Sequence, residues 1–434
     1  MAIKETAVPQ ANGSATAPAV TFEAIRQADQ EHVIGTYGRY PLALVRGRGT
    51  RVWDTDGRSY LDFIGGIAVN VLGHCHPAVS AAIAKQAKTL IHASNLFYTL
   101  PYVELAELLA ETGLPGPVFF CNSGTEAVEG AIKLARKYAA TNGKKGRRIV
   151  AVEGGFHGRT MAALAATGKP QFWQGFEPLP PGFVHVPLND VAALEKAFSY
   201  GAGAAAGDAA GDAPCAVIIE VIQGEGGIRP LSAEFLGAAR ALCDRHGSLL
   251  IIDEIQTGMG RTGSFWSFQD TAVKPDIMTA AKGLGGGLPI GFFSASDNVA
   301  AALRPGDHGS TFGANPVACA AASVTVREVL KPGFLSSVRE TGGALNALLA
   351  DIAAANPKAV RAARGKGLMA ALDMASVDLA KRVLDECREG GLLVNRTADT
   401  VIRLLPPLNV SRAEVRRAAS VLRAAVGRAQ LAGQ

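Results

Sequence analysis

From residue 116 onward, the chain alternates short apolar runs with longer segments in which apolar residues recur every three or four positions. The short runs have the length of β-strands, and the longer segments have the periodicity of amphipathic helices. The predicted strands are 118–121, 148–152, 183–186, 216–221, 249–252 and 277–279, and the predicted helices are 125–139, 233–246 and 316–330. This alternation is typical of a mostly parallel sheet covered by helices. We therefore predict an α/β fold.

The pattern changes after Pro332-Gly333, where the remaining hundred or so residues have the pattern of a smaller α+β unit. Near the other end, two apolar runs flank Asp56-Gly57 and predict a β-hairpin. The predicted elements are strands 51–54, 60–63, 368–372 and 401–405 and helices 379–389 and 412–428. We expect both chain ends to build one small domain.

These patterns predict four segments: a flexible leader, 1–20; an N-terminal part of the small domain, 21–75; a large domain, 76–331; and a C-terminal part of the small domain, 332–434. The leader is rich in Ala, Thr, Pro, Ser and Gly. Residues 201–214 are nearly all Gly, Ala and Asp, which predicts a surface insertion rather than a domain boundary.

Composition and charge narrow the class of protein. Of 434 residues, 48% are hydrophobic and 19% are charged, against about 25% charged in typical soluble domains. The net charge of +5 comes from scattered basic residues, so we expect no nucleic-acid partner. The apolar runs are far shorter than the roughly 18 residues of a spanning helix, so we expect no membrane partner.

The six cysteines contain no C-x-x-C pair, which argues against a zinc knuckle or a disulfide framework. We expect reduced, mostly buried thiols. The first twenty residues lack the apolar segment of a secretory signal and the arginines of a transit peptide. A cytoplasmic location is therefore the expectation.

The first candidate for chemistry is the segment Asn122-Ser123-Gly124-Thr125-Glu126, between a predicted strand and a predicted helix. The free N–H groups and the positive dipole end of a helix start make an anion site. The alternative is an ordinary helix cap by Ser123 or Thr125. This feature alone favours the cap, so the anion site needs support from other residues.

Two further groups supply that support. Asp253-Glu254 ends a strongly apolar strand, where α/β proteins bind ligands, and Lys282 follows 29 residues after Asp253 between small residues. Pyridoxal 5′-phosphate (PLP) requires N–H donors for its phosphate, a carboxylate for its pyridine nitrogen and a lysine amine for its aldehyde. The combination favours PLP, although a lysine so placed is commonly an ordinary surface residue.

One competing motif is the sequence 258–263, which matches the G-x-G-x-x-G pattern of dinucleotide-binding proteins. The acids at 253 and 254 would repel a pyrophosphate, and residues 264–268 do not form a helix start. We interpret this segment as a glycine-rich packing loop beside the cofactor.

Five ordered motifs carry a family resemblance: 122–125, 155–160 (Gly-Phe-His-Gly-Arg-Thr), 220–227 (Glu-Val-Ile-Gln-Gly-Glu-Gly-Gly), 253–258 (Asp-Glu-Ile-Gln-Thr-Gly) and Lys282. Together they resemble the class III (ω-amino acid) aminotransferases, from about Tyr37 to the C-terminus. The resemblance implies PLP fold type I, with a large PLP domain and a smaller domain from both chain ends. It also implies a homodimer with active sites at the subunit interface. One departure is Val221, where many family members have proline.

The resemblance also implies roles for single residues. Lys282 would bond to the aldehyde, Asp253 would hold the pyridine nitrogen, Phe156 would stack on the ring and Gln256 would contact its hydroxyl. The phosphate would be bound by Ser123, Gly124 and Thr125 and, from the neighbouring subunit, by Thr311. Thr311 belongs to a segment that begins at Ser310, which we include among the substrate-binding candidates.

Within the class, segments 65–77, 92–99, 390–395 and 401–408 resemble the acetylornithine aminotransferases. This predicts amino transfer from N2-acetylornithine to 2-oxoglutarate, a step of arginine biosynthesis. Arginine suits bidentate carboxylate binding. Arg159 would hold the distal carboxylate and Arg403 the α-carboxylate of glutamate, while Glu225 would pair with Arg403 whenever the donor is an ω-amine.

Several alternatives stay open. Tyr37 and Tyr98 resemble residues that line the substrate channel in ornithine-type relatives, so ornithine and 4-aminobutyrate remain candidate donors. Succinylornithine and N-succinyl-diaminopimelate also remain, because acyl preference depends on pocket shape. A catalytically silent PLP-binding or dinucleotide-binding protein is the alternative from another class. We expect no metal site, because His74-Cys75-His76 lies in a Gly/Pro turn without an evident fourth ligand.

Overall fold

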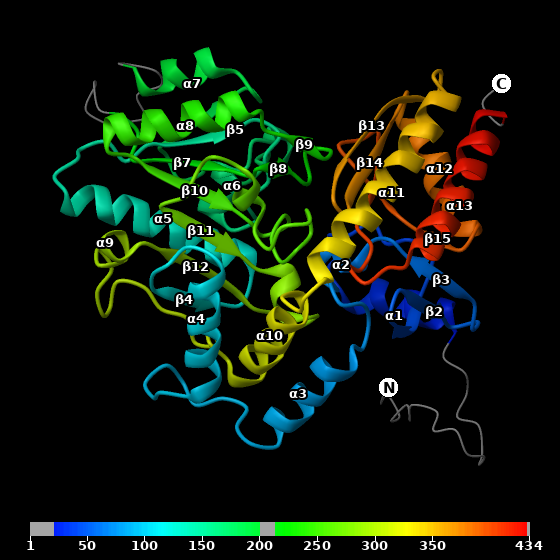
Figure 1. Cartoon of the computed structure of the whole chain (residues 1–434), viewed down its shortest axis with the longest axis horizontal. Coiled ribbons are helices and arrows are strands. Elements are labelled where there is room, and N and C mark those ends of the chain that lie inside the picture. Colours follow the sequence, from blue (N-terminus) through cyan, green and yellow to red (C-terminus); the bar gives the residue numbers. More distant parts are fainter. Residues whose placement is uncertain (1–20, 200–212, 432–434) are drawn as a thin grey trace.

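The structure, a computed structural model, describes residues 21–199 and 213–431 (Figure 1). The predicted leader 1–20 and almost all of the predicted insertion 201–214 lie outside the described residues. Among the described helices, none combines the length and the apolar character of a membrane span.

A seven-stranded sheet forms the centre of the larger part of the molecule (Figure 1). Its strands, in spatial order, are β4 (Val118–Cys121), β12 (Gly291–Ala295), β11 (Ile277–Ala280), β10 (Leu249–Asp253), β7 (Ala216–Ile219), β5 (Ile149–Val152) and β6 (Phe183–Val186). All run parallel except β12, which is antiparallel to both neighbours. The predicted mostly parallel sheet is confirmed, whereas β12 was not predicted and β7 ends two residues earlier than expected.

Helices cover both faces of this sheet, which explains why its strands are apolar without interruption. Successive side chains of a strand point to opposite faces. Val217 and Ile219 share a buried cluster with α8 (Ala233–His246), while Ile218 packs in another cluster with α5 (Gly124–Thr141). The other helices of this part are α3 (Pro77–Ala87), α4 (Leu100–Thr112), α6 (Met161–Ala166), α7 (Val191–Phe198), α9 (Asp297–Ala300) and α10 (Pro316–Val329).

The C-terminal region forms an antiparallel sheet covered by long helices. The sheet order is β13 (Val360–Lys366), β14 (Met369–Met374), β17 (Val401–Leu404) and β16 (Asn395–Thr397). The helices are α11 (Phe334–Ala355), α12 (Val377–Glu389) and α13 (Arg412–Leu431). The predicted strands and helices of this region are present with shifts of a few residues at their ends, and α11, β13 and β16 are additional.

A third sheet joins the two ends of the chain. Its order is β1 (Leu44–Arg48), β2 (Arg51–Asp54), β3 (Ser59–Asp62) and β15 (Leu392–Leu393), and β15 is parallel to β3. The hairpin predicted around Asp56-Gly57 connects β2 and β3. In Figure 1, the blue N-terminal elements accordingly lie beside the orange and red C-terminal ones. The domain boundaries remain a prediction.

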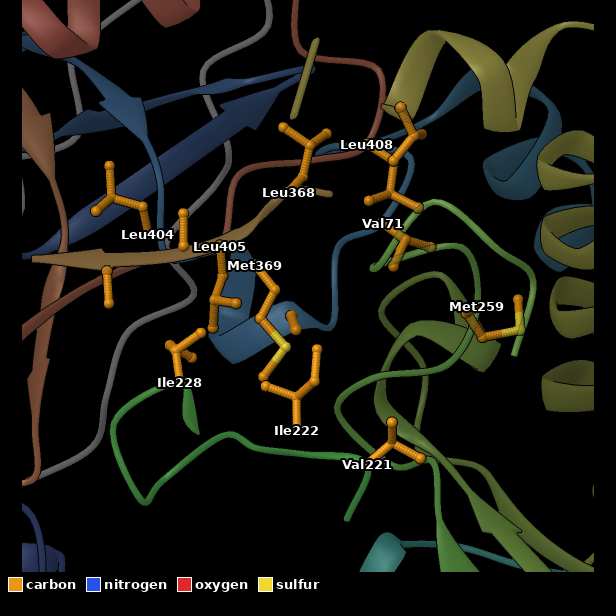
Figure 2. Close-up of a cluster of buried hydrophobic side chains, with 14 of the residues drawn as sticks. Val71, Val221, Ile222, Ile228, Met259, Leu368, Met369, Leu404, Leu405 and Leu408 are labelled. Atoms are coloured by element: carbon orange, nitrogen blue, oxygen red, sulfur yellow. The ribbon is translucent and has the colours of Figure 1, made fainter. Parts of the chain in front are cut away.

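Short elements complete the chain: α1 (Phe22–His32), α2 (Gly65–Ala68), the two-stranded ribbon β8 (Ile222–Gln223) and β9 (Arg229–Pro230), and the 3-10 helices Pro170–Phe172, Ser267–Asp270 and Lys282–Gly285. One apolar cluster connects the C-terminal sheet to the loops of the central sheet (Figure 2). In it, Leu404, Leu405 and Leu408 lie in the same buried cluster as Val221 and Ile222. This packing fixes the strand that carries Arg403 against the large sheet.

Of the six cysteines, five are buried and Cys75 is exposed, and all are free thiols. The expectation of reduced, mostly buried thiols agrees with this placement.

Candidate active site

A cavity of about 460 Å³ opens at the carboxyl ends of the parallel strands, the edge at which open α/β sheets bind ligands. The turns that follow β4, β5, β7, β10 and β11 all contribute to its wall. Eight of the predicted site residues line it: Ser123, Gly124, Thr125, Phe156, Arg159, Asp253, Gln256 and Lys282. The fold therefore brings together residues that lie up to 159 positions apart in the sequence.

Asp253, at the end of β10, is held in place by a buried histidine. His157 Nδ1 lies 2.8 Å from Asp253 Oδ2, and both side chains are almost completely buried. The other carboxylate oxygen accepts a hydrogen bond of 3.0 Å from the amide of Ile255. Burial by itself lowers the pKa of His157, but the hydrogen bond and the charge of Asp253 outweigh this and raise it. The pair fixes the orientation of the carboxylate at the cavity wall.

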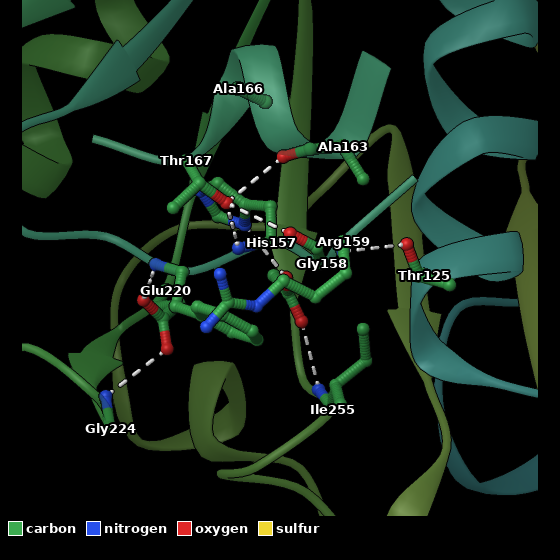
Figure 3. Close-up of polar contacts among 12 residues, drawn as sticks. Thr125, His157, Gly158, Arg159, Ala163, Ala166, Thr167, Glu220, Gly224 and Ile255 are labelled. Atoms are coloured by element: carbon green, nitrogen blue, oxygen red, sulfur yellow. Dashed lines mark hydrogen bonds and ion pairs between the residues drawn. The ribbon is translucent and has the colours of Figure 1, made fainter. Parts of the chain in front are cut away.

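The loop around His157 is itself anchored (Figure 3). The His157 amide donates to Thr167 Oγ1 at 2.9 Å, and that hydroxyl donates to the carbonyl of Ala163 at 2.9 Å. Glu220, which follows β7, accepts hydrogen bonds from the amides of Phe156 at 3.0 Å and Gly224 at 3.1 Å. Burial raises the pKa of Glu220, Asp253 adds to this, and His157 opposes it.

Lys282 is the lysine of the cavity wall and opens a 3-10 helix directly after β11. Its backbone adopts the left-handed region at φ 41°, which L-residues other than Asn and Asp rarely enter. Burial lowers the pKa of its amine, and the nearby Arg403 acts in the same direction, whereas Glu225, Asp253 and Glu220 oppose the shift. A lowered pKa makes the neutral, nucleophilic amine more available.

The start of α5 forms another part of the wall. Ser123 is the helix cap, and its hydroxyl accepts a hydrogen bond from the amide of Glu126. The amides of Gly124 and Thr125 have no acceptor in the part of the chain that the structure describes. A Cβ atom on Gly124 would lie 2.8 Å from Ile255. The capping interpretation therefore holds for Ser123, and the two following amides remain free to bind an anion.

Glu225 and Arg403 form a partly buried ion pair beside the cavity, although they lie 178 positions apart in the sequence. Arg403 Nη1 donates to Glu225 Oε1 at 2.6 Å and to Gln256 Oε1 at 3.1 Å, and its Nε donates to Asn395 Oδ1 at 3.2 Å. Burial would raise the pKa of Glu225, but Arg403, with Lys282 and Lys169, lowers it to about 2.

Arg159 lies at the mouth of the cavity. Its guanidinium stacks over the ring of Phe172 at 3.8 Å and lies 5.5 Å from the ring of Phe156. The two rings meet edge to face at 6.3 Å. Aromatic faces stabilise a cation without neutralising it, so Arg159 remains able to bind a carboxylate.

The remaining candidates do not reach this cavity in a single chain. Tyr37 is 75% exposed, Tyr98 is 94% exposed, and Thr311 is exposed as well. Ser310 accepts hydrogen bonds from the side chain of Asn122 at 3.2 Å and from the amide of Gly313 at 3.0 Å. Asn122 lines the cavity, so Ser310 contacts a residue of the cavity wall.

The sequence predicted no role for His157 or Glu220, although each lies inside a family motif that also contains a residue with an assigned role, Phe156 in one and Glu225 in the other. A single histidine or glutamate has no spacing pattern of its own, so the motif was the only available signal. Among the described residues, no group of three or more His, Cys, Asp or Glu side chains is arranged to hold a metal ion.

The glycine-rich segment 258–263 packs between the two parts of the molecule. The buried Arg261 donates to the carbonyls of Leu368 at 3.0 Å and Pro406 at 2.6 Å. The next element along the chain is a 3-10 turn, Ser267–Asp270, rather than an α-helix. The segment is therefore a packing loop, and the dinucleotide motif lacks the helix that would bind a pyrophosphate.

Comparison with known proteins gives a consistent result. The family model of class III aminotransferases matches residues 35–426. The acetylornithine aminotransferase of Caldanaerobacter subterraneus subsp. tengcongensis is 48% identical over 395 residues, which cover 91% of this chain and 97% of that protein.

Two solved structures share the fold. The ornithine aminotransferase of Toxoplasma gondii, described with partial occupancy of PLP at its active site, superposes with a TM-score of 0.87 at 31% identity, covering 94% of this chain and 95% of the other. The N-acetylornithine aminotransferase of Stenotrophomonas maltophilia gives 0.78 at 36% identity, covering 94% and 100%. The fold and the family implied by the sequence motifs are confirmed.

Proposed function

We propose that this chain, which belongs to the class III aminotransferases, moves the δ-amino group of N2-acetylornithine to 2-oxoglutarate. The products are N-acetylglutamate 5-semialdehyde and glutamate. The relatives named acetylornithine aminotransferase support this choice. The observation that carries it is the pair of arginines at the cavity: Arg159 is unpaired by carboxylates among the described residues, and Arg403 is held by Glu225.

The cavity fits PLP, the cofactor on which class III aminotransferases depend. The amides of Gly124 and Thr125 would hold its phosphate, Asp253 its pyridine nitrogen and Gln256 its hydroxyl, with Phe156 against the ring. Lys282 would bond to its aldehyde. When bound, the cofactor supplies an electron sink for the substrate carbon that loses a proton.

The chain's own residues then divide the work. The amine of Lys282, with its lowered pKa, would remove the proton of the substrate carbon and deliver it to the carbon that carried the aldehyde. The Asp253 carboxylate lies in the cavity wall, where His157 orients it. Arg159 binds the carboxylate that both substrates carry at their distal ends.

The ion pair of Glu225 and Arg403 lets one pocket accept two kinds of donor. N2-acetylornithine presents an ω-amine and no carboxylate near the reacting carbon, so Glu225 stays on Arg403. Glutamate and 2-oxoglutarate carry an α-carboxylate next to the reacting carbon, and this group replaces Glu225 on the guanidinium. Discrimination between the two donors thus depends on the cost of breaking this partly buried ion pair.

A panel of amino donors tests the substrate assignment. With saturating 2-oxoglutarate, we expect N2-acetylornithine to give the highest kcat/KM. Ornithine and 4-aminobutyrate should have a kcat/KM at least about tenfold lower, because neither carries the N-acetyl group of N2-acetylornithine. Succinylornithine and N-succinyl-diaminopimelate complete the panel. A preference for ornithine or 4-aminobutyrate would overturn the assignment while leaving the aminotransferase chemistry in place.

We also propose a homodimer in which each subunit completes the site of the other. Large apolar side chains are exposed on the two segments that carry Tyr98 and Thr311, among them Ile91, Leu96, Phe97 and Phe312. Asn315 Nδ2 donates to the carbonyl of Ile91 at 2.9 Å and His92 contacts the ring of Phe312, so the two segments form one surface. Burial of this surface against a second copy would place Thr311 at the partner's cavity.

Thr311→Ala is expected to weaken PLP retention about ten- to a hundredfold, the effect of one lost hydrogen bond to a charged phosphate. The dissociation constant of PLP is measured by titration of the apoenzyme, with the oligomeric state from light scattering. Thr55→Ala, in the turn between β2 and β3, is the control. A monomer that retains PLP as tightly as the dimer would contradict both the shared site and the role of Thr311.

A further inference from the structure

Lys169 is a half-buried cation that the proposed mechanism leaves without a role. It immediately precedes the 3-10 helix Pro170–Phe172, and its Nζ donates to the main-chain carbonyl of Glu225 at 2.6 Å. The same ammonium lies 5.6 Å from the ring of Phe172. It forms no ion pair with a carboxylate of the described residues. Burial lowers its pKa, and the charges of Glu225 and Glu220 act against this shift.

The Glu225 carboxylate is seen in one position, which we call the closed position. There its Oε1 accepts from Arg403 Nη1 at 2.6 Å and its Oε2 accepts from Thr397 Oγ1 at 3.1 Å. The Thr397 hydroxyl also lies 2.8 Å from the Glu225 carbonyl, and with one proton it can serve only one of these acceptors at a time. Thr397 therefore stabilises the closed position and can also satisfy the carbonyl when the carboxylate leaves.

Binding of an α-carboxylate to Arg403 forces the Glu225 carboxylate out of the closed position. The side chain of Glu225 is only 25% exposed, so a carboxylate released without a partner would be a buried, uncompensated charge. The ammonium of Lys169 lies beside the backbone of the same residue. Its charge already acts on the Glu225 carboxylate in the closed position, so a change of side-chain rotamer at Glu225 is the movement that an ion pair with Lys169 requires.

We propose that Lys169 receives the Glu225 carboxylate when glutamate or 2-oxoglutarate occupies Arg403. Lys169 and Thr397 thus hold the two ends of the switch: Thr397 favours the closed position and Lys169 the open one. Both are positioning residues for the α-carboxylate site. The inference rests on the proposed function, because it takes the Glu225–Arg403 pair as the element that distinguishes the two donors.

The other cations near Glu225 are less suited to this role. Lys282 also lowers the pKa of Glu225, but an ion pair with Glu225 would withdraw the amine from the reaction. Arg364 donates to the Gly227 carbonyl and is already paired with Asp373 at 3.0 Å. Arg159 is needed for the distal carboxylate. Lys169, by contrast, contacts a carbonyl and an aromatic ring rather than a carboxylate. Its charge is therefore available to the Glu225 carboxylate.

The test compares two non-reacting ligands on the holoenzyme. Glutarate carries two carboxylates and must displace Glu225 to reach both arginines, whereas pentanoate carries one and needs only Arg159. In Lys169→Gln, the amide keeps a donor for the Glu225 carbonyl but removes the charge. We expect glutarate binding, measured by isothermal titration calorimetry, to weaken roughly tenfold and pentanoate binding to stay within about twofold. Lys85→Gln, on the exposed face of α3, should leave both unchanged.

Two further variants distinguish a role of Lys169 in the switch from a purely structural role of that residue. Thr397→Val should tighten glutarate severalfold, opposite in sign to Lys169→Gln, because it weakens the closed position. In the Glu225→Ala background, Lys169→Gln should no longer affect glutarate, as a double-mutant cycle requires of residues that act through each other. A crystal structure with glutarate should show the Glu225 carboxylate within 4 Å of Lys169 Nζ.

Equal weakening of glutarate and pentanoate in Lys169→Gln would overturn the proposal, as would an unchanged effect in the Glu225→Ala background. These measurements involve binding and no amino transfer. If the donor panel showed that the wild-type protein does not use N2-acetylornithine, the proposed function would be overturned. The comparison of glutarate with pentanoate would still decide the role of Lys169.

Discussion

Replacing Lys282 with alanine is expected to reduce amino transfer at least about ten-thousandfold, the scale of losing both a nucleophile and a general base. Lys282 is the one primary amine in the wall of the described cavity. Its amine has a lowered pKa, and its backbone adopts the left-handed region just after β11. In Lys282→Ala, a water molecule or another side chain would have to move the proton without being positioned for that task.

Two measurements check this result. Single-turnover kinetics with N2-acetylornithine report the chemical step, and mass spectrometry after borohydride reduction reports whether PLP is attached to residue 282. Lys274→Ala, an exposed lysine just before β11, is the matched control and should retain both. If Lys282→Ala kept covalent PLP and measurable turnover, the role would belong to a different lysine.

The architecture of the central sheet was largely predictable, because its strands are short apolar runs separated by helix-length segments. Buried on both faces, strands such as β7 and β10 carry no polar alternation, and that continuity is itself the signal of a parallel sheet. The direction of β12 was not predictable. Its residues Gly291–Ala295 are equally buried, and an apolar run carries no information on whether a strand runs parallel or antiparallel to its neighbours.

Other elements lacked a clear local signal. Helix α11 contains Gly342-Gly343 in its middle, a pair that usually interrupts a helix. A Cβ on Gly342 would lie 2.4 Å from the backbone of Gly367, so the glycine is required by close packing against the turn between β13 and β14. Tertiary packing here overrides helix propensity, and the local sequence carries no sign of it.

The site was predictable in proportion to how local each signal is. Ser123, Gly124 and Thr125 form a strand-to-helix turn, and Asp253 ends an apolar strand, so their chemistry follows from position in the sheet. The pairing of Glu225 with Arg403 spans 178 residues and came only from family motifs. Lys169 and Thr397 lie outside the motifs that were used, and their contact with Glu225 appears only after folding.

Residues at the predicted subunit interface form a separate group. Tyr37, Tyr98 and Thr311 are exposed in the single chain, so their assigned roles depend on a second copy. Sequence resemblance proposed them, and one chain does not test them. For Lys282 and Asp253, by contrast, the fold of a single chain already forms the cavity in which both side chains would act.

Asp253→Ala is expected to reduce turnover by about a hundred- to a thousandfold while changing PLP affinity much less. The carboxylate lies in the cavity wall, held by His157 at 2.8 Å and by the amide of Ile255 at 3.0 Å, so its charge is fixed before the substrate arrives. Its removal leaves the amides of Gly124 and Thr125 able to bind the phosphate. It also withdraws the charge that would keep the pyridine nitrogen protonated and the electron sink effective.

The adjacent acid provides the control for this prediction. Glu254 is equally buried, but its carboxylate accepts hydrogen bonds from Thr257 at 2.6 Å and Ser267 at 2.7 Å, away from the cavity wall. Glu254→Gln should therefore lower the thermal stability and leave the turnover of each PLP-loaded subunit nearly unchanged. Turnover and PLP content are measured on the same samples. If Asp253→Ala retained wild-type turnover per bound PLP, or if Glu254→Gln lost as much, the charge at the end of β10 would have only a structural role.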